Sequence, residues 1–224
     1  MSPEPPLTVE PLVVGIAGGS GSGKSALAGA VAGELGSPRV AVLCQDAYYR
    51  DPAHLDAAAR AVLNFDVPEA LDLELFRTHL QALRRGQAVT PPSYCFVTHR
   101  RRGLAAPVEP REVLIVEGLF LLQDPPVRRL LDLSIYLDAP EGLRMARRIA
   151  RDGVERGRPA ADVAAQCRAT VLPAHARWVE PSREWADLVL VNAGDLADVA
   201  GPVAAVIRAR LEARGRTAAG VPAA

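Results

Sequence analysis

The sequence predicts an α/β fold built on a parallel β-sheet, and two observations carry that prediction. Apolar runs typical of strands lie at 12–17, 112–118 and 133–137, with helix-forming stretches between them. Continuous apolar runs indicate strands that are buried on both faces, as in parallel sheets covered by helices. The first run also leads through a glycine-rich loop straight into a helical stretch at 25–35. The 224 residues are enough for one such domain with a small appended lobe, and we expect it to span 11–214.

The loop at 18–25 reads GGSGSGKS and matches the G-x-x-x-x-G-K-S pattern of phosphate-binding loops. Its glycines allow a tight curl of inward-pointing N–H groups, and the helix N-terminus adds partial positive charge. Lys24, the only lysine in the chain, would reach the terminal phosphates, and the Ser25 hydroxyl would be a ligand of Mg²⁺. A glycine-rich turn without catalytic meaning is the alternative, but it does not explain the strand–loop–helix order. We therefore expect phosphates to bind at Gly18, Gly19, Ser20, Gly21, Ser22, Gly23, Lys24 and Ser25.

Two carboxylates follow predicted strands. A second strand is expected at 39–43, and Asp46 comes just after it, where ligands bind in open parallel sheets. A helix cap is an equally good interpretation of Asp46 from its position alone. Glu117 ends the buried run at 112–118, and a carboxylate there is the usual second anchor of Mg²⁺ beside a phosphate loop.

The stretch at 52–85 predicts two helices separated by a break at 64–68. Asp66 is either the N-cap of the second helix or a substrate contact. Residues 89–108 predict a β-hairpin lobe outside the parallel sheet. Its rings Tyr94 and Phe96, beside His99, suit recognition of a planar base, with a small hydrophobic plug as the alternative. The three arginines at 100–102 are interpreted as a solvated turn rather than a phosphate contact.

An arginine-rich segment follows at 142–158, and we expect it to feed a mobile lid over 152–168 that closes on phosphates. The alternative is a surface arginine helix. The helical face carries Arg144, Arg148 and Arg151 at i, i+4 and i+7. The expected lid loop contains Gly153 and Gly157 and is flanked by Arg151, Arg156 and Arg158. Further expected elements are a helix at 159–180, a strand at 188–191, a closing helix at 196–214, a disordered lead at 1–10 and a flexible tail at 215–224.

Composition excludes some classes of function. Net charge is zero with a pI near 6.9, so the whole chain has no electrostatic attraction to nucleic acid or anionic membranes, and we expect neither as a partner. Cys44, Cys95 and Cys167 show no metal or disulfide spacing, which favours reduced thiols in a cytoplasmic protein. No signal-peptide pattern or membrane-spanning apolar run is evident.

These segments, taken in order over 12–192, resemble the uridine kinase (uridine–cytidine kinase) family of P-loop nucleoside kinases. The matching stretches are GGSGSGKS, QDAYYR, NFDVPEALD, SYCFVTHRR, VLIVEGLFLL, RRIARDGVERGR and PAHARWVEPSREWADLVL. The resemblance implies a P-loop kinase fold with a five-stranded parallel sheet flanked by helices, a β-hairpin lobe and an arginine-rich lid. It also implies phosphorylation of the 5′-hydroxyl of uridine and/or cytidine by ATP (or GTP) with Mg²⁺, in pyrimidine salvage. A related small-molecule kinase, such as a phosphoribulokinase-like enzyme, is the alternative.

By this resemblance the site residues take specific roles. Asp46 would be the general base and would join Ser25 and Glu117 in holding Mg²⁺. Lys24, Arg151 and Arg156 would serve the ATP phosphates, with Lys24 and Arg151 also catalytic. Asp66 and Arg148 would bind the ribose hydroxyls. Tyr94, Phe96 and His99 would bind the pyrimidine. The rest of the acceptor site would be formed by Tyr49, Phe65, Arg158 and Gln166. We also expect a homo-oligomer.

The chain departs from the family pattern at three positions: Cys95 replaces Asp, Val67 replaces His and Ala47 replaces Ser. The change at Cys95 bears on substrate preference rather than on the reaction. Two other classes fit less well. A GTPase would use the N-x-x-D at 192–195, which lacks the guanine-reading lysine, and its D-x-x-G at 198–201 comes in the wrong order. A non-catalytic nucleotide-binding regulator would lack carboxylates such as Asp46 and Glu117.

Overall fold

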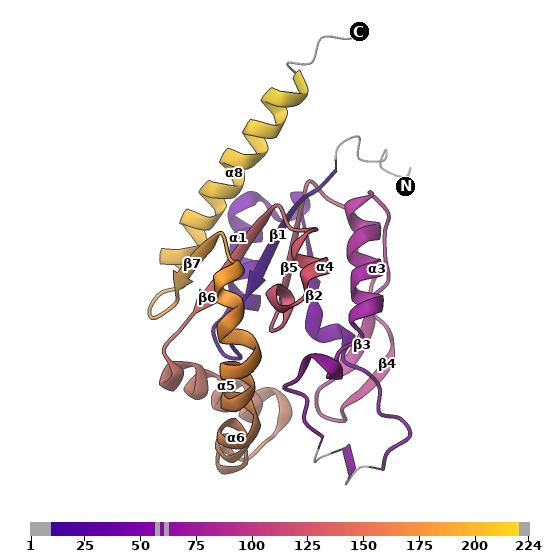
Figure 1. Cartoon of the computed structure of the whole chain (residues 1–224), viewed down its shortest axis with the longest axis vertical. Helices are drawn as coiled ribbons and strands as arrows, with labels where there is room; N and C mark the ends of the chain where they lie inside the picture. The colour runs from indigo at the N-terminus through magenta and orange to yellow at the C-terminus, as the bar shows by residue number, and fades with distance from the viewer. Residues whose placement is uncertain (1–9, 57–58, 61–62, 220–224) are drawn as a thin grey trace.

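The computed structural model describes residues 10–56, 59–60 and 63–219, and its centre is a five-stranded parallel sheet (Figure 1). The strands lie in the order β2-β5-β1-β6-β7. Their bounds are Leu12–Ala17 for β1, Val40–Cys44 for β2, Val113–Gly118 for β5, Leu133–Asp138 for β6 and Leu188–Val191 for β7. The predicted α/β class with its parallel sheet is confirmed.

Helices cover both faces of this sheet, which is why its central strands are apolar throughout. Successive side chains of a strand point to opposite faces, and in β1 every residue is buried. Val14 faces a core shared with α1 (Lys24–Leu35) and α8 (Ala197–Ala219). Val13 faces the other core, which contains residues of α3 (Leu73–Arg84). The result is a three-layer sandwich in which the carboxyl ends of the parallel strands meet at one edge of the sheet.

Asp66 does not cap α3, so that interpretation is wrong. The N-cap of α3 is Asp72, whose carboxylate accepts a hydrogen bond from the Leu75 N–H at 3.3 Å. Of the first helix expected in this region, the described residues 59–60 are helical, and the Arg60 N–H donates to the Asp56 carbonyl at 3.0 Å. Residues 52–56 form a turn, and the remainder includes residues 57–58 and 61–62, which lie outside the described part.

The hairpin lobe is confirmed as a separate antiparallel pair, β3 (Pro92–Cys95) and β4 (Arg100–Leu104). Its three arginines lie in strand β4 rather than in a turn, and only Arg102 is exposed to solvent as expected. Arg101 donates hydrogen bonds to the carbonyls of Tyr49 and Tyr48, at 3.0 and 3.3 Å, and Arg100 pairs with Asp51 at 2.7 Å. Arg100 and Arg101 therefore fasten the hairpin to the loop that follows β2, because both find a partner there.

The chain after β6 forms a second, helical lobe at the strand ends. Helix α5 spans Glu141–Arg156 and α6 spans Ala160–Gln166, while the short α4 (Pro125–Arg128) lies earlier in the chain. In Figure 1 the hairpin and the α5–α6 pair lie to either side of the space below the strand ends. This placement puts two lobes around one edge of the sheet.

The single helix expected at 159–180 contains two π-helical segments. After α6 the chain winds through Cys167–Val171, then α7 (Leu172–Ala174), then His175–Val179, and a 3-10 segment follows at Glu180–Trp185. Segments of π-helix are rare and frequently lie at functional sites. They change which side chains face the sheet edge, and the periodicity of the sequence does not show this.

The closing helix α8 extends five residues beyond the predicted end at 214, to Ala219. Arg214 pairs with Asp132 at 2.8 Å and Gly215 lies within the helix, so the expected tail at 215–224 begins inside α8. Of the predicted lead at 1–10, only Glu10 is described, and it pairs with Arg84 at 3.5 Å; residues 1–9 and 220–224 lie outside the described part. None of the helices that the structure describes is long and apolar enough to cross a membrane.

Candidate active site

The phosphate loop occupies the turn between β1 and α1 and is packed tightly against α5. Gly21 has a φ of 78°, and a Cβ there would meet the carbonyl oxygen of Arg144, so only glycine fits. Side chains of other elements hold the loop from outside, among them Arg147, whose Nη1 donates to the Ser22 carbonyl at 3.4 Å. Asn192 Nδ2 donates to the Ser22 carbonyl at 2.7 Å, and Arg148 Nη1 donates to the Ser20 hydroxyl at 2.9 Å. The loop is thus pre-formed in the shape that the motif predicts.

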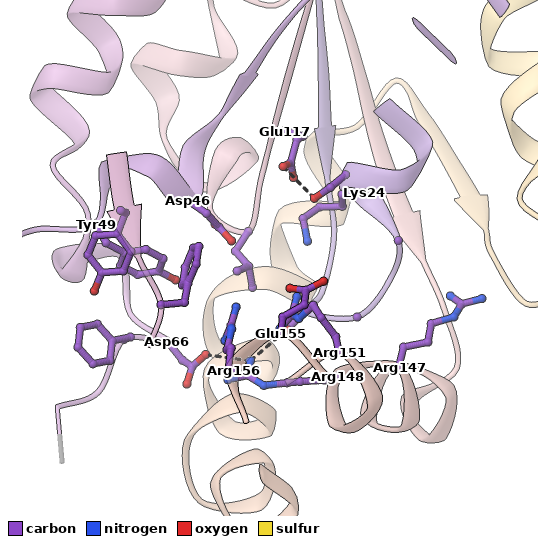
Figure 2. Close-up of a pocket in the computed structure, with 18 of the residues that line it drawn as sticks. Lys24, Asp46, Tyr49, Asp66, Glu117, Arg147, Arg148, Arg151, Glu155 and Arg156 are labelled. Carbon is purple, nitrogen blue, oxygen red and sulfur yellow. Dashed lines mark hydrogen bonds and ion pairs between the residues drawn. The ribbon is translucent and has the colours of Figure 1, made fainter. Parts of the chain in front are cut away.

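Lys24 is the first residue of α1, and its ammonium group lies inside the loop. The residue is only 8% exposed, and Nζ donates a hydrogen bond to the Gly19 carbonyl at 3.1 Å. Burial lowers the pKa of Lys24, while the nearby carboxylates of Glu117 and Asp46 act in the opposite direction. Figure 2 shows Lys24 and Asp46 extending toward the same space from neighbouring elements.

Asp46 does not cap a helix, so the cap interpretation is wrong. It lies inside the 3-10 segment Gln45–Tyr48. The N-cap of that segment is Cys44, and no side-chain hydrogen bond caps it among the described residues. Burial, and next the negative charge of Glu117, raise the pKa of Asp46, although Lys24 and nearby arginines oppose the shift. A carboxyl with a raised pKa beside a phosphate loop is suited to accept a proton.

The residues expected to hold Mg²⁺ form a set of oxygen donors of the right kind. Ser25 Oγ donates a hydrogen bond to Glu117 Oε1 at 2.9 Å, and Asp46 is close enough for Glu117 to raise its pKa. Mg²⁺ prefers hard oxygen ligands, usually one or two carboxylates together with phosphates. A cation here would also relieve the repulsion between the two carboxylates. No group of three His, Cys, Asp or Glu side chains in the described ranges could hold a metal ion by itself, so phosphate oxygens would have to complete the shell.

Aromatic rings form the opposite end of the site. The Tyr49 and Tyr94 ring centroids are 5.3 Å apart, and Phe96 packs edge-on against Tyr94 at 5.2 Å. Phe65 and His99 stack with centroids 4.3 Å apart and an interplanar angle of 10°. Planar surfaces of this kind suit a flat heterocycle. We call this group the aromatic corner: Tyr49, Phe65, Tyr94, Phe96 and His99.

Two polar groups give the aromatic corner hydrogen-bonding capacity. Burial, and next the charges of Arg156 and Arg158, lower the pKa of His99, so its imidazole is neutral at pH 7 and can donate or accept. The Tyr94 hydroxyl is buried and has no hydrogen-bond partner among the described residues. A buried hydroxyl without a partner is costly, which favours a ligand atom at this position.

Asp66 lies between the aromatic corner and the phosphate loop, together with Arg148. One of its carboxylate oxygens is 3.6 Å from Arg148 Nη1, and the other accepts a hydrogen bond from the Thr170 hydroxyl at 2.9 Å. Arg148 also bonds to Ser20 in the loop and lies 3.4 Å from Gln166 Oε1. Arg148 thus links the two ends of the site. Thr170, in the first π-helical segment, is a contact that the sequence did not predict.

The expected lid loop at Gly153 is wrong, because α5 continues unbroken to Arg156. Only Gly157, with a φ of 63°, ends the helix. The side chains of Arg151, Arg156 and Arg158 instead converge on the buried carboxylate of Asp152. Figure 2 shows Arg148, Arg151 and Arg156 approaching the site from the side opposite Asp46, whereas Arg147 points away from them.

One cavity of about 380 Å³ joins these groups. Most of the predicted site residues line it: Ser20, Gly21, Gly23, Lys24, Ser25, Asp46, Tyr49, Phe65, Asp66, Tyr94, Phe96, His99, Glu117, Arg148, Arg151, Arg156, Arg158 and Gln166. Gly18, Gly19 and Ser22 belong to the loop but do not line the cavity. Ala26, Leu119, Arg147 and Glu155 line it and were not predicted. The i, i+4 spacing of Asp152 from Arg148 and Arg156 could have indicated its contacts, whereas no local pattern indicates Thr170.

A parallel sheet with G-x-x-x-x-G-K-S after its first strand, and carboxylates facing that loop across a shared cavity, defines a P-loop kinase, a nucleotide-binding phosphotransferase. The chain belongs to the Phosphoribulokinase / Uridine kinase family, whose profile matches residues 13–199.

Individual relatives agree with this family. The chain is 40% identical over 207 residues to a uridine kinase of Chloroflexus aurantiacus, an alignment that covers 92% of this chain and 99% of the relative. It is also 40% identical over 187 residues to a uridine kinase of Shewanella sp. (strain ANA-3), covering 82% and 88%. A crystal structure of a provisionally named fructose transport system kinase from Silicibacter sp. TM1040 is 28% identical, with a TM-score of 0.67 and coverage of 83% and 92%.

Proposed function

We propose that the protein transfers the terminal phosphoryl group of ATP (or GTP) to the 5′-hydroxyl of uridine and/or cytidine. The observation that carries the proposal is one cavity with the phosphate loop at one end, the aromatic corner at the other and Asp46 between them (Figure 2). The relatives named uridine kinase, at 40% identity over most of the chain, support the same substrate class.

The donor end neutralises the charge of the phosphoryl group. Transfer proceeds through a loose transition state, so the protein mainly positions groups and stabilises spreading negative charge. Lys24 contacts the terminal phosphates from within the loop, and Arg151 and Arg156 approach them from α5. Ser25, Glu117 and Asp46 would hold Mg²⁺, which when bound neutralises phosphate charge as a Lewis acid.

Asp46 accepts the proton of the attacking hydroxyl. As the oxygen–phosphorus bond forms, the 5′-hydroxyl proton passes to the Asp46 carboxylate and the nucleoside diphosphate leaves. The charges of Lys24 and Arg151 keep enough of the carboxyl ionised to act as a base, against the effect of burial and Glu117. The raised pKa brings this carboxyl closer to the operating pH, where a general base is most effective.

The acceptor end selects a ribonucleoside. Asp66 accepts hydrogen bonds from the ribose hydroxyls, and Arg148 donates to them from the opposite side. The pyrimidine packs among the aromatic rings, where neutral His99 presents a donor or an acceptor to the base edge. Tyr94 supplies a hydroxyl that has no other partner in the described residues.

Nucleotide turnover with a panel of acceptors tests the proposal. We expect ADP release to depend on uridine or cytidine, with ribulose 5-phosphate, fructose and an acceptor-free reaction giving background rates. Turnover with ribulose 5-phosphate or fructose but not nucleosides would favour a related small-molecule kinase instead. Acceptor-independent GTP hydrolysis would indicate a GTPase, and nucleotide binding without any turnover would indicate a regulator.

A further inference from the structure

Asp152 is a fully buried carboxylate on which three arginines of α5 and Arg158, just beyond it, converge. Its side chain is 0% exposed, and Oδ1 lies 3.0 Å from Arg151 Nη2 and 3.3 Å from Arg156 Nη1. Oδ2 lies 3.3 Å from Arg158 Nη1 and 3.9 Å from Arg148 Nε. Four guanidinium groups, two expected at the nucleotide phosphates and two at the acceptor, therefore share one carboxylate.

The charge balance of this cluster is unusual. A buried carboxylate is costly unless it is paired, and here it is paired several times over. The four guanidinium groups repel each other, Asp152 and Asp66 pair with them directly, and Asp46 acts on Arg151 and Arg156 across the cavity, so four positive charges face three carboxylates. The excess positive charge suits a polyphosphate, but it also drives the arginines apart when the cavity holds no anion. Asp152, the carboxylate that all four arginines approach, opposes this separation from behind the cavity wall.

The backbone around Asp152 is equally well defined. The residue is four positions from both Arg148 and Arg156 along α5, so all three share one helix face. Its carbonyl oxygen accepts the Arg158 N–H at 3.1 Å, where the chain turns at Gly157. The same residue thus fixes the end of α5 and the directions of the arginine side chains on both sides of that turn.

The contacts leave the arginines able to bind a ligand. A guanidinium group has five N–H donors, and Asp152 engages only some of them in each arginine. Arg148 Nε is buried with no hydrogen-bond partner among the described residues, because 3.9 Å is too long for a hydrogen bond. Asp152 itself is absent from the residues that line the cavity in the described structure, so a substrate would meet the arginines and not the carboxylate.

We propose that Asp152 is a positioning residue that aligns Arg151 and Arg156 for phosphoryl transfer and Arg148 and Arg158 for acceptor binding. The proposal rests on the proposed function for the roles of these arginines. Its core is electrostatic: the negative charge of Asp152, and not its volume, holds the four side chains in one arrangement.

Steady-state kinetics of Asp152→Asn and Asp152→Glu test this. Asn keeps the shape and loses the charge, so we expect kcat to fall about 100-fold, the scale of a misplacement near 1 Å. The KM for ATP should change less than about threefold, because four positive charges still attract the phosphates. Glu restores the charge with one extra methylene, and we expect it to recover at least about tenfold in kcat. Asp162→Asn, which removes an exposed carboxylate from the nearby α6, is the matched control and should behave like the wild type.

Several outcomes would overturn the proposal. If Asn matches the wild type, or if Asn is more active than Glu, the residue matters for packing and not for charge. If neither variant folds, the carboxylate stabilises the fold rather than aligning arginines. Failure of the proposed function gives a different result, because the wild type itself would then reject uridine and cytidine. In that case the kcat values of the wild type, Asp152→Asn and Asp152→Glu are compared with the acceptor that the panel identifies. The thermal stabilisation produced by ATP needs no acceptor, and its loss in Asp152→Asn would contradict a role in alignment alone.

Discussion

Asp46 combines a raised pKa with a position between the phosphate loop and the aromatic corner. Asp46→Asn keeps the shape but cannot accept a proton, so we expect kcat to fall by about 10² to 10⁴. Steady-state and single-turnover rates measure this loss. An unchanged rate, with the chemical step shown to be rate-limiting, would contradict the proposed role of Asp46 as a base.

The same substitution has a predicted effect on stability that depends on pH. Because the folded protein raises the pKa of Asp46 above its ordinary value of 3.8, ionising this carboxyl destabilises the fold. In the wild type its favourable contribution is complete below about pH 4 and is lost as the pH rises through the folded-state pKa. The ligand-free Asn variant cannot ionise there, so it should become progressively more stable than the wild type across that window. Denaturant unfolding at several pH values decides this, and a difference that shrinks with rising pH would contradict it.

Under the proposed function, His99 is the residue that we expect to distinguish uracil from cytosine. Its neutral imidazole can face the acceptor oxygen of uracil or the amino donor of cytosine, whereas an ionised carboxylate only accepts. The positive charges of Arg156 and Arg158, which lower the pKa of His99, would keep a carboxyl at this position ionised. His99→Asp should therefore favour cytidine over uridine by about 1 to 3 kcal/mol, or roughly fivefold to 150-fold in relative kcat/KM. If the ratio of the two substrates stays constant, His99 does not contact the base edge.

At the scale of elements, the first π-helical segment brings Thr170 to Asp66 across 104 positions of sequence. Thr170→Val keeps the branched shape and removes the hydrogen bond to the carboxylate. A bond to a charged group contributes about 1.5 to 3 kcal/mol, so the nucleoside KM should rise about tenfold or more, with the KM for ATP unchanged.

Thr78→Val is the control for that experiment. Thr78 is exposed, its hydroxyl bonds to the Glu74 carbonyl within α3, and it does not line the cavity, so its loss should leave both KM values as they are. A parallel rise in the KM for ATP in Thr170→Val would show a general distortion of the cavity instead of a local effect on Asp66.

The sequence predicts well those elements whose residue pattern lies within one short stretch of the chain. The buried runs of β1 and β5, and the glycine pattern between β1 and α1, depend on neighbouring residues alone. The loop expected at Gly153 is wrong because glycine, although a weak helix former, is held inside α5 by the contacts of Asp152 with the arginines around it. The contact of Thr170 with Asp66 depends on a change of helix type, which hydrophobic periodicity does not reveal.

At the scale of the molecule, residues of the phosphate loop, the hairpin and α5–α6 line one cavity. A ligand bound at either end of this cavity should therefore raise the free energy of unfolding of the whole molecule, independently of a ligand at the other end. A ligand at about 100 times its Kd stabilises by about 2.7 kcal/mol, or ~5 to 10 °C in Tm for a chain of this size. Asp66→Asn should abolish the shift produced by uridine and retain the shift produced by ATP. Thermal unfolding with each ligand measures this, with uracil as the control. Loss of both shifts would place Asp66 in the fold and not at the acceptor end.

The same division explains how much of the site the sequence predicts. Residues that belong to the quoted family segments, such as Lys24 and Glu117, can be placed from those segments alone. The motif does not predict which residues of the loop line the cavity. Gly18 packs against β6 and Gly19 against α5, and neither they nor Ser22 are among the lining residues. Three-dimensional packing, and not the motif, separates residues that can touch a ligand from residues that only shape the loop.

The position of Lys24 also has a practical consequence for chemical labelling. Because every other cationic side chain is an arginine, the folded protein offers amine-directed acylating reagents one side-chain target, and it lies inside the phosphate loop. Burial lowers the pKa of this amine and so increases its nucleophilic fraction, while the same burial restricts access to it. Once labelling of the amino terminus is subtracted, the fraction of molecules that gain the mass of one acyl group equals the fraction whose phosphate loop is free of nucleotide. The molecule therefore contains its own single-residue probe of occupancy, one that needs neither a substrate nor an engineered label.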